Sequence, residues 1–368
     1  MKILLTAEQR GSVNAVAPVA RELLSRGHDL SIYATGNKNE AAGFGDLPHN
    51  RISPTQEAYS RLLRGQDVAV VGMTAFDSPD GHFLRAANEA GIPTVAIQDK
   101  NERYAERLGK DVSGLPTIMA VMNEACIGSA RAELGDEAAN RSRVVGWTAF
   151  DHYAKAVGNF TDRDREELLT KIGLDPGRLV HLHLTQSIHP EAAYWEGKNW
   201  GYDRRARFFL EGHDVTQFTF EAAADLGLYL VVKPHPGEMH DINPTADLAK
   251  RHGFQFIHPK ACNTQELMLA SNSITAGKST ALNEAALLDI NTGGLLPDVP
   301  TADIVGQYPA IDTGAIPHTQ NWRGLRDIVA TVSTENEGIL GTLAERRKKF
   351  SVDGNASKRL ADIVEGLT

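Results

Sequence analysis

Short runs of aliphatic and β-branched residues alternate with helical stretches twice along the 368-residue chain. In the first half, the strand-like runs are KILLT (residues 2–6), DLSIYAT, DVAVVGMT and PTVAIQ, followed by the weaker TIMAVM and SRVVG. Amphipathic stretches lie between them, including residues 13–27, 56–64, 81–90 and 123–134. Apolar strands joined by helices indicate a parallel, doubly wound sheet.

The alternation pauses over residues 146–178 and then starts again. This interval is polar and helical, and it ends in the turn signal DPG. LVHLHLT, LYLVVK, FQFIH, NSITA and NTGGLL then follow as strands with helices between them. A single core usually stops growing at about 250 to 300 residues, so two domains are expected. We predict an α/β protein with Rossmann-like domains at residues 1–157 and 158–345, and a closing helix at 346–368 that returns to the first domain.

Composition narrows the functional classes. The formal net charge of -9 argues against a nucleic-acid binder, which would carry a basic surplus. Cys126 and Cys262 show no CxxC spacing, so neither a zinc knuckle nor a disulfide framework is indicated, and a reducing cytoplasm fits best. No run approaches the roughly 20 apolar residues of a membrane span, so any membrane contact is expected to be peripheral.

A ligand is expected between the two domains, at the carboxyl ends of the strands. The loop LVVKPHPGEMH follows an apolar strand of the second half, and two prolines stiffen the backbone around His235. A histidine there, beside Lys233, can donate a hydrogen bond or a positive charge to a phosphate oxygen. We therefore predict phosphate contacts from Lys233 and His235; an ordinary turn with a surface histidine is the alternative.

A second phosphate-binding turn is predicted where NSITA runs into GKST. Gly277 would allow the turn, and Ser279 and Thr280 would offer hydroxyl groups and free amides at a helix start. Glu284, one turn further on, could accept hydrogen bonds from two ribose hydroxyls, although simple capping would explain these residues as well. This turn is no Walker A loop, because Asn272 stands where that motif needs its first glycine.

In the first half, TAEQRGSVNAV connects the first strand to the first helix. It lacks G-x-G-x-x-G, so a dinucleotide fingerprint is not indicated. Gly11 and Ser12 could still receive an anionic or hydroxyl-rich group at the helix start. A tight turn, with Ser12 or Asn14 as the helix N-cap, explains these residues equally well.

Polar and acidic residues follow the strand PTVAIQ. Gln98, Asp99 and Glu102 come at or just after its end, on the side where the cleft is expected. A carboxylate there could act as a general base on an acceptor hydroxyl, so Asp99 and Glu102 are catalytic candidates. A solvated acidic loop at a helix start is an equally simple explanation.

The first strand of the second half is rich in histidine. Gln186 and Ser187 lie at its end and are included among the predicted nucleotide contacts, and His189 follows as a catalytic candidate. His181 and His183 alternate along the strand and therefore share one face. No third ligand with suitable spacing follows, so we predict a buried strand face here and no metal site.

Taken together, these segments resemble the two-domain GT-B glycosyltransferases. The resemblance rests on the strand-Gly-helix start, VVGWTAFD, KPHP, GKSTALNEAALL and the closing DGNASKRLADIV, and it follows the order of elements over nearly the whole chain. The nearest branches are bacterial surface-polysaccharide transferases with a KPHP or HP motif: capsule Kdo transferases, bacterial sialyltransferases and CDP-glycerol glycerophosphotransferases. Non-hydrolysing UDP-GlcNAc 2-epimerases are also similar, especially in the closing segment.

The resemblance implies that His235 contacts the donor phosphate together with Ser279 and Thr280. It implies that Glu284 binds ribose. It further implies transfer of a sugar or glycerol-phosphate-like group from a UDP-, CDP- or CMP-activated donor to a hydroxyl acceptor, in the synthesis of surface polysaccharides or glycoconjugates. No metal and no cofactor beyond the donor substrate are expected, because helix dipoles and side chains stabilise the leaving phosphate. An oligomer is compatible with the sequence.

Two alternatives stay open. The epimerases have a segment similar to HVEAGLR after the fourth strand, where this chain reads AIQDKNER. The glutamate of that segment is therefore replaced by Gln98 here, or the acidic residue is shifted to Asp99. Their His-Arg-x-Glu-Asn segment is also missing, which places epimerisation second. The other alternative is a non-catalytic binding protein with the same fold.

Overall fold

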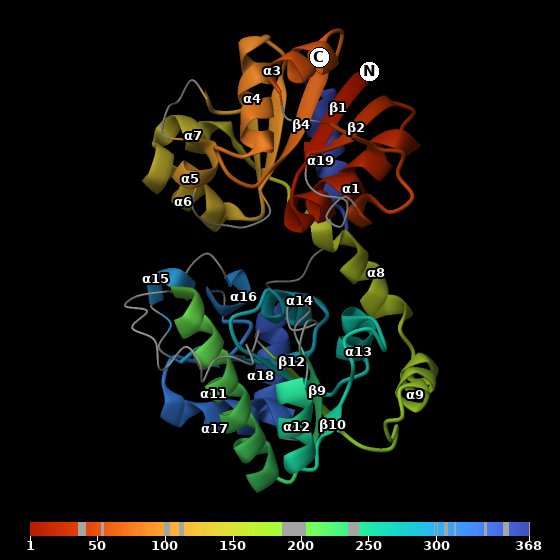
Figure 1. Ribbon diagram of the computed structural model, residues 1–368, viewed down its shortest axis with the longest axis vertical. Helices are drawn as coiled ribbons and strands as arrows, with labels where there is room; N and C mark the ends of the chain where they lie inside the picture. Colours follow the sequence, from red (N-terminus) through yellow and green to blue (C-terminus); the bar gives the residue numbers. More distant parts are fainter. Residues whose placement is uncertain are drawn as a thin grey trace. The chain divides into compact units, whose positions relative to one another are not determined.

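The structure is a computed structural model. It describes residues 1–35, 42–52, 55–98, 104–109, 114–185, 204–234, 243–297, 299, 301–304, 308–312, 314–334, 337–348 and 353–367. The chain divides into two compact units: unit 1 consists of Met1–Lys155 with Val352–Thr368, and unit 2 of Ala156–Ser351. Each unit has its own parallel sheet with helices around it, so the predicted α/β class with two doubly wound sheets is confirmed (Figure 1).

The sheet of unit 1 has the strand order β3-β2-β1-β4-β5-β6-β7 within the described residues, and neighbouring strands are parallel. Its strands are β1 (Lys2–Ala7), β2 (Asp29–Ala34), β3 (Asn50–Arg51), β4 (Val68–Met73), β5 (Thr94–Gln98), β6 (Ile118–Val121) and β7 (Ser142–Val144). Strands β4 and β5 are buried along their whole length, which explains their continuous apolar sequences.

Helices cover both faces of this sheet. They are α1 (Arg10–Ser25), α3 (Gln56–Leu63), α4 (Pro79–Glu89), α5 (Tyr104–Leu108), α6 (Glu124–Leu134), α7 (Asp136–Arg141) and α19 (Ala356–Glu365), with short 3-10 helices η1 (Ala42–Phe44) and η3 (Thr148–Phe150). One apolar cluster includes residues of α1 and α19, and the other includes residues of α3, α4 and α6. Helix α8 (Asp151–Asn159) begins in unit 1 and ends in unit 2.

Helix α19 belongs to unit 1 although it comes last in the chain. Its Leu360 and Val364 are fully buried in the same cluster as α1 and β1, and its ribbon lies beside α1 in Figure 1. Asp151 accepts hydrogen bonds from the backbone N–H groups of Ala356 (2.9 Å) and Ser357 (2.7 Å). A carboxylate at this position satisfies amides that a helix start leaves open.

Unit 2 has the strand order β10-β9-β8-β11-β12-β13 within the described residues, again parallel. Its strands are β8 (Val180–Leu184), β9 (Tyr229–Lys233), β10 (Gln255–Phe256), β11 (Ser273–Ala276), β12 (Asn291–Leu295) and β13 (His318–Thr319). Its helices are α9 (Asp162–Lys171), α11 (Arg204–Asp225), α12 (Asn243–Arg251), α13 (Thr264–Leu269), α14 (Ala281–Leu287), α15 (Thr301–Ile304), α16 (Pro309–Asp312), η5 (Trp322–Gly324), α17 (Leu325–Ser333) and α18 (Glu337–Lys348).

The structure differs from the sequence prediction at several element ends. Helix α1 begins at Arg10, not Val13, because the backbone N–H of Gln9 finds an acceptor in the Ser12 hydroxyl. The sequence predicts a helix over residues 278–288, whereas helix α14 begins at Ala281. The two-residue strands β3 and β13 were not predicted, since two residues are too few to show a periodic pattern.

Candidate functional site

In the sequence, the predicted site residues stand at or soon after the ends of strands, and open α/β sheets bind their ligands at the carboxyl ends of strands. The structure describes the following residues of this set: Gly11 and Ser12 in unit 1, and Lys233, Gly277, Ser279, Thr280 and Glu284 in unit 2. The other six lie outside the described residues: Asp99, Glu102, Gln186, Ser187, His189 and His235. Their roles therefore stay predictions.

Ser12 shapes the turn between β1 and α1. The residue is fully buried, and its Oγ accepts hydrogen bonds from the N–H groups of Glu8 (3.3 Å) and Gln9 (3.2 Å). Gly72 on β4 permits the close approach of α1, because a Cβ at that position would lie 2.9 Å from the Ser12 Cβ. Gly11 lies in the first turn of α1 and is exposed. Of the two predicted contacts in this turn, Gly11 is therefore the one that faces solvent.

Two buried polar residues at this edge were not among the predicted site residues. Asp80, in the first turn of α4, is fully buried, and its burial raises the pKa of the carboxyl to about 8. Gln98, the last residue of β5, is 4% exposed, and neither of its amide atoms has a hydrogen-bond partner among the described residues. Buried polar atoms are nearly always paired, so unpaired ones need an explanation. The signal for Gln98 is a polar residue that ends an otherwise apolar strand, whereas SPDG around Asp80 has the sequence of an exposed turn.

In unit 2, hydroxyl groups lie at the start of α14. The Ser279 N–H donates to the carbonyl oxygen of Gly277 (2.8 Å), and the Ser279 Oγ accepts from the Ala281 N–H (3.2 Å). Thr280 is the N-cap residue; it is exposed, and its side chain makes no capping hydrogen bond. Glu284 is half-buried in the first turn of the helix. The structure thus places Gly277, Ser279, Thr280 and Glu284 in one short segment after β11, with the Thr280 hydroxyl at the surface.

Lys233, the last residue of β9, is 3% exposed, and its ammonium group has internal partners. The Nζ donates hydrogen bonds to the carbonyl oxygens of Pro259 (2.9 Å) and Cys262 (3.1 Å). Burial lowers the pKa of this amine. These bonds tie β9 to the segment before α13, so Lys233 has a structural role beside the predicted contact with phosphate.

His181 and His183 are buried on β8, as predicted. Nδ1 of His181 lies 2.7 Å from the Ser273 Oγ, and both imidazoles lie 3.1 Å from the Thr275 Oγ1. Nε2 of His183 lies 3.4 Å from the Thr216 Oγ1 on α11. Burial lowers the pKa of both rings, to about 4 for His181 and about 3 for His183. The two imidazoles are therefore neutral members of a hydroxyl chain inside unit 2.

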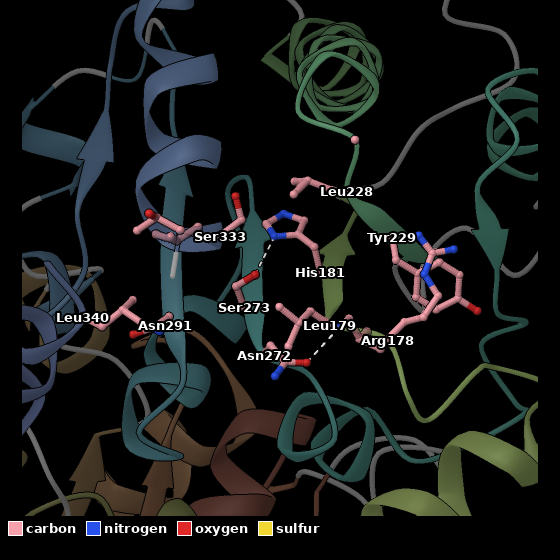
Figure 2. Close-up of a pocket in the computed structure, with 14 residues that line it drawn as sticks. Arg178, Leu179, His181, Leu228, Tyr229, Asn272, Ser273, Asn291, Ser333 and Leu340 are labelled. Carbon is pink, nitrogen blue, oxygen red and sulfur yellow. Dashed lines mark hydrogen bonds between the residues drawn. The ribbon is translucent and has the colours of Figure 1, made fainter. Parts of the chain in front are cut away.

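A pocket of about 640 Å³ opens at the other edge of the same sheet, at the amino ends of β8, β9, β11 and β12 (Figure 2). The Arg178 guanidinium lies 4.1 Å from the centre of the Tyr229 ring, and the Asn272 Oδ1 accepts from the Val180 N–H (2.9 Å). His181 lines this pocket with its ring hydrogen-bonded to Ser273. Its position separates this pocket from the predicted nucleotide site, which follows the carboxyl ends of the strands.

Two further observations concern metals and membranes. Within the described parts of the chain, no group of three or more His, Cys, Asp or Glu side chains is arranged to hold a metal ion. Over the same residues, none of the helices has the length and apolar character needed to cross a bilayer.

No protein-family model matches the sequence, and no curated protein does. Solved structures are similar over almost the full chain. A UDP-GlcNAc 2-epimerase from Neisseria meningitidis bound to UDP-GlcNAc has a TM-score of 0.68 at 17% identity, with 100% of each chain covered. MurG from Acinetobacter baumannii has a TM-score of 0.61 at 14% identity, with 99% of each chain covered. The wall teichoic acid polymerase TagF has a TM-score of 0.60 at 10% identity, with 99% of this chain and 88% of that chain covered.

At these identities the likeness concerns the fold. The similar structures have the two-domain GT-B fold, and they include epimerases as well as transferases. The expected resemblance to both groups is confirmed, and the chain has the GT-B fold.

Proposed function

We propose that this chain is a metal-independent glycosyltransferase of the GT-B fold. It moves a sugar, or a glycerol-phosphate-like group, from a nucleotide-activated donor to a hydroxyl acceptor. The observation that carries this proposal is the segment after β11, which presents the exposed Thr280 hydroxyl at the start of α14 and Glu284 one turn further on. A hydroxyl group at the positive end of a helix suits phosphate, and a carboxylate suits a pair of ribose hydroxyls.

The proposed reaction is a direct displacement. Asp99 or Glu102 takes the proton of the acceptor hydroxyl, with His189 as a further catalytic candidate. The acceptor oxygen forms a bond to the anomeric carbon while the bond between that carbon and the donor phosphate oxygen breaks. The nucleotide leaves with the negative charge, which the positive end of the α14 dipole, the Thr280 hydroxyl and His235 stabilise. For a glycerol-phosphate-like group, the same exchange takes place at phosphorus.

A UDP-sugar 2-epimerase is the second candidate, because proteins of that activity are among the similar structures. The residue at the end of β5 argues against it. Where the resembling epimerase segment has a glutamate, this chain has Gln98, and an amide cannot take a proton from carbon as a carboxylate does. We therefore favour transfer.

Thermal unfolding in the presence of UDP, CDP, CMP or GDP tests the donor site. A nucleotide at a hundredfold excess over its Kd stabilises the folded protein by about 2.7 kcal/mol, which corresponds to roughly 5 to 10 °C for a domain of this size. The shift should shrink in a Ser279→Ala, Thr280→Val double variant. It should persist in Thr331→Val, where the lost hydroxyl donates to the Asp327 carbonyl oxygen on α17. No shift with any of the four nucleotides would refute a nucleotide donor.

Product analysis then separates the two activities. A transferase releases free nucleotide only when a hydroxyl acceptor is present, apart from slow hydrolysis. An epimerase converts a UDP-sugar into its C2 epimer without any acceptor. Conversion without acceptor, lost on Asp99→Asn, would replace the transferase proposal by the epimerase alternative.

A further inference from the structure

Three elements of unit 1 meet at one enclosed carboxyl group. Asp80, the second residue of α4, has no exposed surface. Its Oδ1 accepts a hydrogen bond from the Oγ1 of Thr35 (2.9 Å), and Thr35 is the residue that follows β2. Its Oδ2 has no hydrogen-bond partner among the described residues, and neither has the Oγ1 of Thr6 on β1, which is also fully buried. A buried carboxyl group with only one of its oxygens bonded is an unusual arrangement.

The surroundings of Asp80 disfavour the ionised form of its carboxyl group. Burial is the largest cause of its raised pKa, and the carboxylate of Glu8, at the end of β1, raises it further. The Thr35 hydroxyl, which donates to Oδ1, acts in the opposite direction, as do the nearby Thr6 hydroxyl and Glu8 N–H, without cancelling the effect of burial. With a pKa of about 8, Asp80 carries a proton at neutral pH.

The third titratable group of this cluster comes from α3. Tyr59 is 1% exposed, and its hydroxyl donates to the carbonyl oxygen of Pro79, the first residue of α4 (3.1 Å). Burial raises the Tyr59 pKa to about 12, and the charges of Asp80 and Glu8 add to this effect. The residue after β2 contributes the neutral hydroxyl of Thr35. Tyr59 therefore stays neutral below about pH 12, and Asp80 is the buried group of this cluster that changes charge near neutral pH.

The cluster is joined to the turn between β1 and α1. The N–H of Glu8, the first residue of that turn, lies near enough to the Asp80 carboxyl to lower its pKa, and it donates a hydrogen bond to the Ser12 Oγ (3.3 Å). We propose that Asp80 is a protonated positioning residue that ties the carboxyl ends of β1 and β2 to α4, so that loss of its proton loosens the turn over Glu8 to Ser12. This turn carries Gly11, but the inference does not depend on the transferase proposal.

The direction of the pH effect follows from linkage. In an opened turn Asp80 meets water and ionises near pH 4, whereas in the closed turn it keeps its proton up to about pH 8. The opening equilibrium should therefore rise about tenfold per pH unit between pH 5 and pH 7 and level off above pH 8.

Amide hydrogen exchange measures this opening. The reporters are the Val13 N–H, bonded to the Gln9 carbonyl oxygen (2.9 Å), and the Thr35 N–H, bonded to the Ala7 carbonyl oxygen (3.1 Å). After correction for intrinsic exchange rates, their protection should fall about tenfold per pH unit from pH 5 to pH 7.

Two variants test the source of this slope. Asp80→Asn, which keeps the shape of the neutral carboxyl group, should remove it. Asp77→Asn replaces an exposed carboxylate two residues before the start of α4, and this variant should keep the pH dependence of the wild type. Equal slopes in the wild type and in Asp80→Asn would overturn the proposal.

A second measurement needs no variant and so covers the case in which Asp80→Asn does not fold. In the wild-type protein labelled with ¹³C at aspartate carboxyl groups, one resonance should titrate with a midpoint near pH 8, the value expected for Asp80. A free aspartate side chain in water titrates near pH 4. If no aspartate resonance titrates near pH 8, Asp80 is ionised at neutral pH and the proposal is wrong.

Discussion

Acid should destabilise unit 2 through the two buried histidines of β8. His181 and His183 are 2% and 1% exposed, and their ring nitrogens lie within hydrogen-bond distance of hydroxyl groups on β11 and α11. A proton added to either ring would place a charge inside the unit, where no carboxylate appears among the contacts of these rings in the described residues. Replacing one of the two imidazoles by a neutral amide, as in His183→Gln, removes half of this sensitivity.

The magnitude follows from the pKa values. Burial lowers them to about 4 and about 3 in the folded protein, whereas a histidine in the unfolded chain titrates near 6.5. The unfolded chain therefore takes up protons first, and stability is lost as the pH falls below about 6.5. Between pH 7 and pH 5, each imidazole contributes about 2 kcal/mol to this loss, so the pair contributes about 4 kcal/mol.

Hydrogen exchange at the slowest amides of β8 and β11 gives the free energy of unfolding of unit 2 at each pH. From pH 7 to pH 5 this free energy should fall by about 4 kcal/mol in the wild type and by about 2 kcal/mol in His183→Gln. The matched control is His258→Gln, which replaces an exposed histidine of the same unit and should keep the full slope. If His183→Gln loses as much stability as the wild type, the buried imidazoles are not the acid-sensitive groups.

Three other substitutions test contacts described above. Asp151→Ala removes the acceptor of two amides at the start of α19 and should destabilise unit 1 by about 1 to 2 kcal/mol in denaturant titrations; an unchanged midpoint would argue against this cap. Gly72→Ala puts a methyl group against Ser12 on α1 and should lower the free energy of unfolding of unit 1 by about 1 to 3 kcal/mol. Gly65→Ala is not a suitable control, because Gly65 has a positive φ that alanine rarely adopts. Lys233→Met leaves two carbonyl oxygens without their donor and should destabilise unit 2 by about 1 to 3 kcal/mol; a change in nucleotide affinity alone, with stability unaltered, would contradict the structural role.

Much of the fold could be predicted from local pattern. KILLT, DVAVVGMT and PTVAIQ are apolar because their strands are buried on both faces, and this signal survives in a single sequence. The alternation of His181 and His183 likewise predicted a shared, buried face, since side chains of a strand alternate between its two sides. Helix starts were less predictable, because the start of α1 depends on which acceptor the Gln9 amide finds.

The candidate site was predictable only where a motif is local. GKSTALNE places its hydroxyls and its glutamate within a few residues, and the structure has them in one segment after β11. Asp80 shows the opposite case. Its sequence context, a serine, a proline and a glycine, is that of an exposed turn, and its burial arises from contacts with β1, β2 and α3 that lie 20 or more residues away. Such a carboxyl group is recognisable only after the chain has folded.

The place of α19 in unit 1 has a consequence for synthesis on the ribosome. Unit 2 is one continuous segment, so its residues can fold together as soon as they have emerged. Unit 1 starts first, but the apolar cluster of α1 and β1 also contains Leu360 and Val364, which are translated after all of unit 2. Until then, the surface that α19 will cover on α1 is open to water, and the nascent first domain is exposed to aggregation and to chaperones. The earlier-made domain of this chain is therefore completed later than the domain that follows it.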